Sequence, residues 1–318
     1  MARKPRLEFE GAVYHVLNRG NYRSDIFRAE KTRAAFLKCL GEACATMGWR
    51  VHAWCIMSNH FHLALETPGA NLVEGMQWLQ VTFSVRFNRL RKERRLLFQG
   101  RYKSLVVDPA EPGALFQYIH LKPVRAGVCS VEKLAEWPWT SAAWLLNPKE
   151  RAGWFGAGAA LEQAGGLKDT PAGRRKYVEY LAWLAEDEPG RKALGFEKMS
   201  QGWMIGSTSY ARAILADQKE AGLQRQLVQA SGPGQREELW REQMVLLLRR
   251  WKREPEELGK AGKSVDWKLA VAAAMKARSG VTNRWLAENL HMGSLHEVSR
   301  KISAWVKAPD VKLSRKLQ

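Results

Sequence analysis

Apolar and polar residues alternate along the first 125 residues with two different periods. A period of two predicts β-strands, because successive side chains of a strand point to opposite faces of a sheet. A period of three to four predicts amphipathic helices. Strands are predicted at residues 11–18, 49–56, 60–66 and 102–108. Helices are predicted at residues 29–47, 72–95 and 112–121, with Gly48 ending the first and Asn71 capping the second.

The predicted elements follow the order strand, helix, strand, strand, helix, strand, with a further helix after them. This order is typical of a ferredoxin-like fold, in which helices pack on one face of a four-stranded antiparallel sheet. The fold class expected for this part of the chain is therefore α+β. His60 and His62 would lie on a central strand of that sheet.

Two stretches rich in Gly or Pro, at 148–166 and 231–234, predict boundaries further along the chain. We therefore expect three parts. Residues 1–150 would form the α+β domain, residues 151–235 a linker with one helical segment, and residues 236–318 an all-α region. The helical patterns in these last two parts lie at residues 173–186, 237–251, 266–278, 283–290 and 295–306.

The last two predicted helices match a helix-turn-helix, with Thr282 and Ser294 as N-caps and a Gly-containing turn between them. In such a unit Ser299 and Arg300 would face duplex DNA. Four apolar residues would pack inward, namely Leu295, Val298, Ile302 and Trp305. A basic tail at residues 307–316 also favours contact with DNA. A purely structural helical bundle is the alternative.

The composition narrows the class of protein and of partner. The 318 residues are 46% hydrophobic and 26% charged, as in soluble globular proteins. The formal net charge of +19 favours a polyanionic partner, and we expect nucleic acid rather than an anionic membrane. No segment is apolar enough to predict a membrane-spanning helix or a secretion signal, so we expect a cytoplasmic protein. The four cysteines have no Cys-x-x-Cys spacing, which predicts buried reduced thiols.

Basic residues gather between positions 86 and 103. Five of them are candidate DNA contacts: Arg86, Arg89, Arg95, Arg101 and Lys103. Phe98 and Tyr102 lie among them, and such a mixture can hold phosphates with its cations and stack bases on its rings. A charged surface that only faces solvent is the alternative.

Three side chains could carry chemistry. His60 and His62 are two positions apart on a predicted strand and so share a face, which presents two imidazole nitrogens side by side. A divalent metal would need a third ligand beside them, and ordinary core or surface histidines are the alternative. The phenol of Tyr118, near the end of a predicted helix, could attack a phosphodiester and form a phosphotyrosine. An aromatic side chain packed at a helix end is the alternative.

Four motifs occur in order: Tyr14-His15-Val16 with Arg19-Gly20, Asn59-His60-Phe61-His62-Leu63, Phe98-Gln99-Gly100-Arg101-Tyr102-Lys103-Ser104, and Tyr118-Ile119-His120-Leu121-Lys122-Pro123-Val124-Arg125-Ala126-Gly127. Together they resemble the single-tyrosine HUH transposases, and most closely the REP-associated tyrosine transposases, over about residues 6–146.

The resemblance implies a transposase that cleaves and rejoins single-stranded DNA near hairpins through a 5′-phosphotyrosine. It implies that His60 and His62 bind the metal, Mg²⁺ or Mn²⁺, and that Tyr118 is the nucleophile. Arg19 and Arg125 lie within the shared motifs and are expected to contact DNA. The oligomeric state, monomer or homodimer, stays open.

The chain departs from the family at Lys122, where members usually supply Asn or Gln as a metal ligand. An ammonium group has no lone pair to give to a cation. Lys122 could instead contact the phosphate or the phenolate, with water, Asn59, Glu66 or His120 completing the coordination. It could also only solvate the helix end, or mark a damaged metal site.

We expect that cleavage is retained and that Lys122 takes part in it. One alternative is a catalytically weak or inactive DNA-binding protein, such as a repressor or structural factor. A second is a metallohydrolase acting on small molecules or RNA. The sequence shows no carboxylate-rich metal cluster, which argues against the second.

Overall fold

The computed structural model describes residues 6–218 and 221–308. The described chain separates into two compact units, one running from Arg6 to Gly206 and one starting at Ser207. This division differs from the three predicted parts, because residues 151–206 belong to the N-terminal unit and do not form a linker. Each unit is described by itself below.

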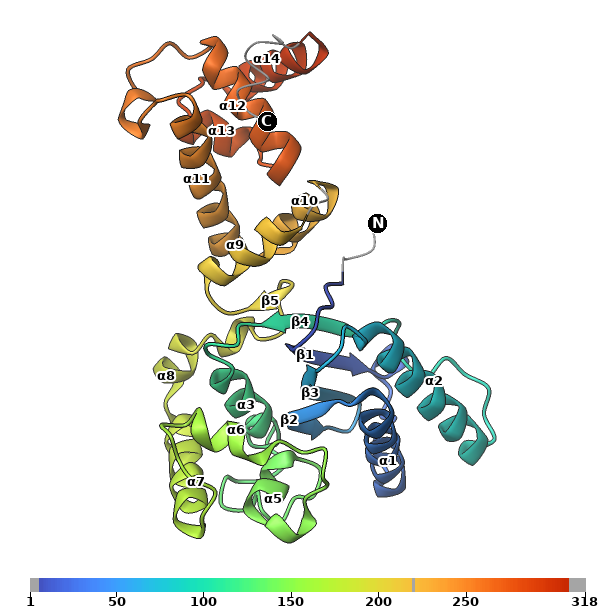
Figure 1. Cartoon of the computed structure of the whole chain (residues 1–318). Coiled ribbons are helices and arrows are strands. Elements are labelled where there is room, and N and C mark those ends of the chain that lie inside the picture. The colour runs from blue at the N-terminus through green and yellow to red at the C-terminus, as the bar shows by residue number, and fades with distance from the viewer. Residues whose placement is uncertain (1–5, 219–220, 309–318) are drawn as a thin grey trace. The chain divides into compact units, whose positions relative to one another are not determined.

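The N-terminal unit is built on a mixed five-stranded sheet with the order β2-β3-β1-β4-β5 (Figure 1). Its four longer strands are antiparallel and confirm the predicted strands. Their bounds are β1 Ala12–Arg19, β2 Arg50–Ile56, β3 His60–Thr67 and β4 Lys103–Val107. The fifth strand, β5 (Met204–Ile205), pairs in parallel with β4 and was not predicted. As predicted, the two histidines lie on an inner strand, β3.

Helices cover both faces of this sheet, whereas the sequence predicted helices on one face. On one face Phe61 of β3 packs against Phe36 of α1 (Glu30–Met47), with ring centroids 4.7 Å apart. On the other face His62 meets Tyr118 of α3 (Gly113–His120) at 5.9 Å. Because successive strand residues point to opposite faces, α1 and α3 lie on opposite sides of β3 (Figure 1). The helix α2 (Leu72–Arg91) packs beside α1.

The predicted helix end at Gly48 is confirmed, whereas the predicted side-chain cap at Asn71 is wrong. Gly48 ends α1 in the left-handed region with φ of 70°. Asn71 precedes α2 but makes no side-chain cap. Its Oδ1 accepts from Trp49 Nε1 at 2.8 Å and its Nδ2 donates to Met47 O at 2.9 Å, so it ties the start of α2 to the end of α1. The helix α2 also ends at Arg91, four residues earlier than predicted.

Residues 121–206 form short helices packed around the α3 side of the unit. The predicted helix at 173–186 is confirmed as α7. The bounds are α4 Lys122–Arg125, α5 Ser141–Leu146, α6 Ala157–Glu162, α7 Pro171–Glu186 and α8 Glu188–Ala193. Short 3₁₀ helices lie at Asn21–Arg23, Pro148–Glu150 and Phe196–Lys198. The predicted Gly-rich linker therefore contains α6, which packs on β2.

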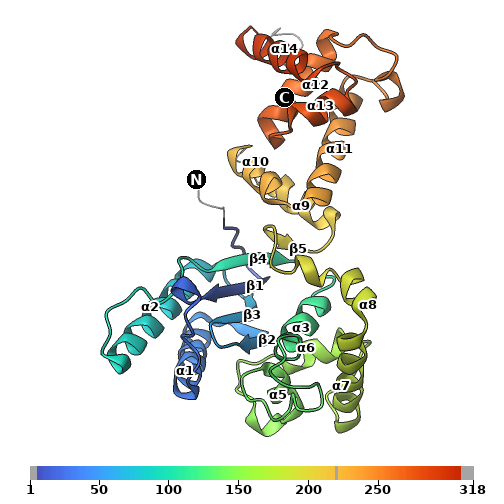
Figure 2. The same ribbon diagram turned by 180° about the vertical axis from the view of Figure 1, so that it is seen from behind.

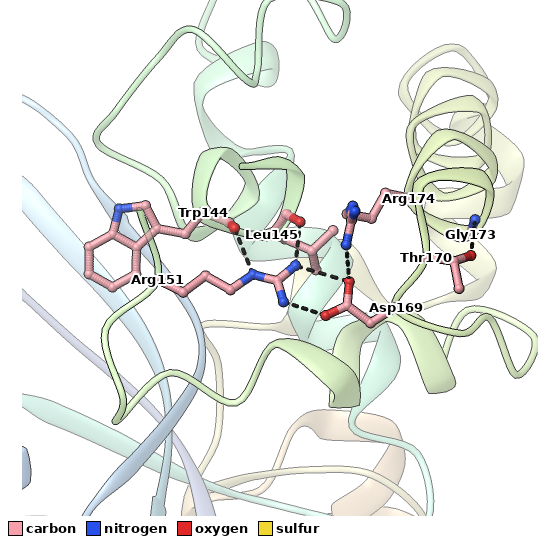
Figure 3. Close-up of polar contacts among 7 residues, drawn as sticks. All are labelled: Trp144, Leu145, Arg151, Asp169, Thr170, Gly173 and Arg174. Atoms are coloured by element: carbon pink, nitrogen blue, oxygen red, sulfur yellow. Dashed lines mark hydrogen bonds and ion pairs between the residues drawn. The ribbon is translucent and has the colours of Figure 1, made fainter. Parts of the chain in front are cut away.

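Arg151 holds this region together (Figure 3). Its guanidinium donates to the backbone oxygens of Trp144 at 2.9 Å and Leu145 at 2.6 Å, and it pairs with Asp169. Arg174 of α7 donates to the same carboxylate at 2.6 Å. The hydrogen bonds from Arg151, followed by those from Arg174, lower the pKa of Asp169. One carboxylate thus joins the chain after α5 to the start of α7.

We expect Asp169→Asn to lower the free energy of unfolding by about 1 kcal/mol, because the two ion pairs are partly screened by solvent. A lowered folded-state pKa stabilises the fold above the unfolded value of about 3.9, and this contribution disappears as the pH falls through the folded value. Urea unfolding at pH 7 and at pH 3 measures both effects. The difference between variant and unsubstituted protein should shrink at pH 3, and an equal difference at both values would contradict this role.

The C-terminal unit is all-α in its described residues, as predicted. Its helices are α9 Thr208–Asp217, α10 Ala221–Ala230, α11 Pro233–Arg250, α12 Asp266–Ser279, α13 Asn283–Asn289 and α14 Leu295–Lys307. A 3₁₀ turn lies at Pro255–Glu257. The helix α12 packs against α10, α11 and α14 (Figure 2). The predicted linker at 231–234 overlaps the first turn of α11, where Pro233 is tolerated.

The last two helices begin at the predicted caps. The side chains of Thr282 and Ser294 accept hydrogen bonds from the backbone of α13 and α14. Val298 and Ile302 are buried as expected, whereas Leu295 is 44% exposed and its predicted inward packing is wrong. On the same helix Trp305 and Ser299 are half-buried, and Arg300 is exposed. The predicted basic tail, from position 309 onward, lies outside the described residues.

Two further expectations concern the whole chain. Within the described ranges, no helix combines the length and the apolar character that crossing a membrane requires. All four cysteines are free thiols; Cys39, Cys44 and Cys55 are buried as predicted, and Cys129 is half-buried.

Candidate active site

A cleft of about 760 Å³ opens beside the ends of β1 and β3. The predicted metal ligands His60 and His62 both face it. Its lining residues are Leu17, Asn18, Arg19, Arg23, Asn59, His60, His62, Gln99, Arg101 and Lys103. The cleft is therefore polar and strongly basic, with two imidazoles in its wall.

The two imidazoles differ in exposure and in hydrogen bonding. The His60 ring is half-buried, and the His62 ring is buried with its centroid 5.1 Å from that of His60. His60 Nδ1 lies 2.6 Å from Asn59 Oδ1, while the amide nitrogen of Asn59 donates to Arg23 O at 3.2 Å. Because an amide oxygen accepts, Nδ1 of His60 carries the proton and Nε2 keeps a lone pair.

His15 is a third imidazole in the site, and it was not among the predicted site residues. It lies on β1 with its ring fully buried. Its Nε2 is 2.9 Å from Nδ1 of His62, and its Nδ1 is 2.6 Å from the backbone oxygen of Met199. The motif Tyr14-His15-Val16 contained the only sequence signal for this residue.

Burial keeps these imidazoles uncharged. It lowers the pKa of His15 to about 3 and of His60 to about 4, and it holds the pKa of His62 well below its usual value. The nearby ammonium of Lys122 adds to each shift. At neutral pH the three rings are therefore neutral and keep lone pairs for hydrogen bonding or for a cation.

Tyr118 projects from α3 toward this histidine cluster. Its ring lies 5.9 Å from the rings of both His62 and His15, measured between centroids. The side chain is 4% exposed. Its hydroxyl is 3.2 Å from Ser200 Oγ, and the ring of Phe196 packs against it edge to face. The structure thus places the predicted nucleophile next to the predicted metal ligand His62. Phe196 and Ser200 cover the Tyr118 side chain.

Lys122 and Arg125 place positive charge beside the phenol. Lys122 Nζ lies 4.2 Å from the centre of the Tyr118 ring, and the guanidinium of Arg125 lies 5.5 Å from it. The helix breaks between Tyr118 and Lys122, because α3 ends at His120 and α4 begins at Lys122. Lys122 nevertheless remains next to the phenol, as its spacing predicted.

Two of the three side chains proposed to replace the missing ligand are engaged elsewhere. Both ring nitrogens of His120 are hydrogen-bonded, one to Tyr177 Oη at 2.7 Å and one to Ser141 Oγ at 2.8 Å. Glu66 pairs with His52 at 2.8 Å. Asn59 alone of the three adjoins the histidines, through its contact with His60.

The donor set fits a divalent cation with two imidazole ligands. His60 and His62 are neutral and face one cleft that also contains amide oxygens. Within residues 6–218 and 221–308, no group of three or more His, Cys, Asp or Glu side chains is placed to hold a metal ion. A cation bound here would therefore draw further ligands from water, an amide oxygen or a DNA phosphate.

Arg125, a candidate DNA-binding residue, lies beside Tyr118, and the other candidates of the N-terminal unit divide into two groups. Arg19, Arg101 and Lys103 line the cleft, as does Arg23, which the sequence did not single out. Arg86 instead packs on α1, where it pairs with Glu42 at 2.8 Å and donates to Cys39 Sγ. Away from the cleft lining, Arg95 pairs with Glu93 at 2.7 Å, and Arg89 is exposed at the end of α2. The cleft group shares its cleft with His62, whose ring lies 5.9 Å from that of Tyr118.

One comparison with known proteins, that with protein families, agrees with the motifs. Residues 8–122 match the family described as "Transposase IS200 like", which confirms the resemblance for a segment that contains His60, His62, Tyr118 and Lys122. One solved structure, "Structure of the REP associates tyrosine transposase bound to a REP hairpin", is similar at 15% identity and a TM-score of 0.39. That similarity covers 48% of this chain and 89% of the other. No curated protein matches the chain.

Proposed function

We propose, from the premise that residues 8–122 form an IS200-like transposase domain, that this protein cleaves and rejoins single-stranded DNA through Tyr118. The DNA substrate would be a single strand next to a hairpin. The observation that carries the proposal is the meeting of Tyr118 with His62 across 5.9 Å, although the two residues come from different elements. The basic cleft that contains His60 and His62 provides the place for the strand.

In the proposed reaction the Tyr118 oxygen attacks a backbone phosphorus and the bond to the 3′ oxygen of the leaving strand breaks. A 5′-phosphotyrosine forms, the phenolic proton passes to solvent, and the released 3′ oxygen takes up a proton. The reverse attack by a 3′ hydroxyl rejoins DNA and frees Tyr118. No net bond energy is lost, because one phosphodiester replaces another.

The residues of the cleft would position and polarise the DNA. His60 and His62 would hold Mg²⁺ or Mn²⁺, which supplies Lewis acidity toward a phosphate oxygen when bound. Lys122 and Arg125, beside the phenol, would stabilise negative charge on Tyr118 and on the phosphate. Arg19, Arg101 and Lys103 would hold the phosphates of the strand.

A DNA-binding protein that does not cut is the second candidate function. It is favoured by Lys122, which cannot act as the usual third metal ligand, and by the burial of Tyr118 beneath Ser200 and Phe196. This candidate shares the basic cleft but makes no covalent product. An assay for the covalent protein–DNA product separates the two functions.

The test is incubation of the full chain with labelled single strands that carry a hairpin, with Mg²⁺, with Mn²⁺ or with a chelator. The proposal predicts a protein–DNA adduct that survives denaturing electrophoresis and forms only with metal. Salt-sensitive DNA binding with no adduct under any condition would instead establish the non-cutting function.

We expect Lys122→Met to slow adduct formation by about 10²-fold, because it removes a cation from the charge that develops in the transition state. Mn²⁺ affinity should not fall, since an ammonium group is not a ligand. Single-turnover cleavage and Mn²⁺ titration measure the two quantities. Lys149→Met, in the exposed 3₁₀ turn at Pro148–Glu150, is the matched control. A large loss of Mn²⁺ affinity in Lys122→Met would show that this role is wrong.

The C-terminal unit would add a second DNA contact. The helices α13 and α14, joined by the turn that contains Gly293, would act as a helix-turn-helix on duplex DNA through Ser299 and Arg300. We place the protein in the cytoplasm, where its free thiols would stay reduced.

A further inference from the structure

A relay of hydrogen bonds runs behind the proposed metal ligand His62. It begins at the backbone oxygen of Met199, passes through both ring nitrogens of His15, and ends at Nδ1 of His62. The two contacts measure 2.6 Å and 2.9 Å. Both rings are buried, with exposures of 0% for His15 and 3% for His62.

The relay defines where each proton lies. A backbone oxygen can only accept, so Nδ1 of His15 carries a hydrogen. A neutral imidazole has one N–H group, which leaves Nε2 of His15 as an acceptor. Nδ1 of His62 must then donate, and Nε2 of His62 keeps its lone pair.

The other proton arrangement would place a cation at His15. An imidazolium there would donate from both nitrogens, and His62 would carry its hydrogen on Nε2, where it blocks a metal. Full burial opposes such a charge.

We propose that His15 is a positioning residue which, by accepting the Nδ1 hydrogen of His62, holds His62 in the tautomer that presents Nε2 to a divalent cation. This inference rests on the proposed function for the assignment of His62 as a ligand. Metal-bound histidines generally donate the N–H of their other ring nitrogen to such a partner, which fixes both the tautomer and the ring orientation. Met199, outside the family match at residues 8–122, orients His15 in turn.

The most direct test reads the tautomer itself in the full chain without metal or DNA. Long-range ¹H–¹⁵N correlation spectra distinguish Nδ1–H from Nε2–H histidines. The expected result is Nδ1–H for His62 and for His15. An Nε2–H tautomer at His62 would overturn the proposal. Because neither metal nor DNA is present, this outcome is separate from any failure to cleave DNA.

Substitutions test the consequence for metal affinity, measured by Mn²⁺ titration. His15→Leu should weaken Mn²⁺ binding about 10- to 100-fold, as loss of such supporting partners does elsewhere. His15→Gln should keep most of the affinity, because its Oε1 can accept from His62. His52→Leu, at a buried strand histidine paired with Glu66, is the matched control and should bind Mn²⁺ as the unsubstituted protein does.

Equal Mn²⁺ affinity in His15→Leu and in the unsubstituted protein would overturn the role of His15. Equal loss of Mn²⁺ affinity in His15→Leu and His52→Leu would also overturn it. The loss would then follow from removing any buried histidine. If His15→Leu does not fold, the His62 tautomer in the spectrum of the unsubstituted chain tests the proposal.

Discussion

Replacing Tyr118 with Phe is expected to abolish the covalent protein–DNA adduct, with a fall of about 10³-fold or more. The substitution removes only the hydroxyl, and the ring can keep its contacts with Phe196 and His15. DNA affinity should therefore change little while covalent chemistry is lost. Denaturing electrophoresis of the adduct and a binding titration at the same salt concentration measure the two effects.

Tyr180→Phe is the matched control for this experiment. Tyr180 is half-buried and donates to Gln117 at 3.4 Å, so its variant also loses a hydroxyl that has a polar partner. It should form the adduct at the normal rate. An adduct that persists in Tyr118→Phe would place the nucleophile on another residue.

Replacing His60 with Ala is expected to lower metal-dependent cleavage by more than about 10²-fold and to weaken Mn²⁺ binding to a similar extent. His60 is half-buried at the start of β3, so its loss should disturb folding less than loss of the buried His62. Excess Mn²⁺ should restore part of the activity of His60→Ala, because the weakened site can still fill. It should restore none in Tyr118→Phe.

His52→Leu serves again as the control for His60→Ala, because it removes a histidine from the neighbouring strand β2 without touching the cleft. Cleavage by His60→Ala at the normal rate and normal metal dependence would show that the histidine pair does not hold the catalytic metal. The site would then be a DNA cleft lined by histidines.

The strands and long helices were predictable because their periods are regular over many residues. The four main strands and α1 lie within two residues of their expected bounds. β5 escaped prediction because a strand of two residues has no period, and it exists only through its pairing with β4. The Gly-rich segment that contains α6 reads as a linker in the sequence, since its contacts with β2 join residues about 100 positions apart.

The candidate site was predictable where its residues share a local motif. His60 and His62 are two positions apart on one strand, and Tyr118 and Lys122 are four positions apart along the chain. His15 and Ser200 were missed because their contacts with His62 and Tyr118 span 47 and 82 positions. Their roles depend on the order of strands in the sheet and on the packing of residues 196–205, which no local pattern records.

Mass spectrometry of the adduct identifies the residue that attacks the DNA. The full chain is incubated with hairpin-bearing single-stranded DNA and Mn²⁺, the adduct is digested with nuclease and trypsin, and the modified peptide is sequenced. The expected product is a nucleotide linked through its 5′ phosphate to Tyr118. A nucleotide on any other residue, or no modified peptide in protein that binds the DNA and the metal, would contradict it.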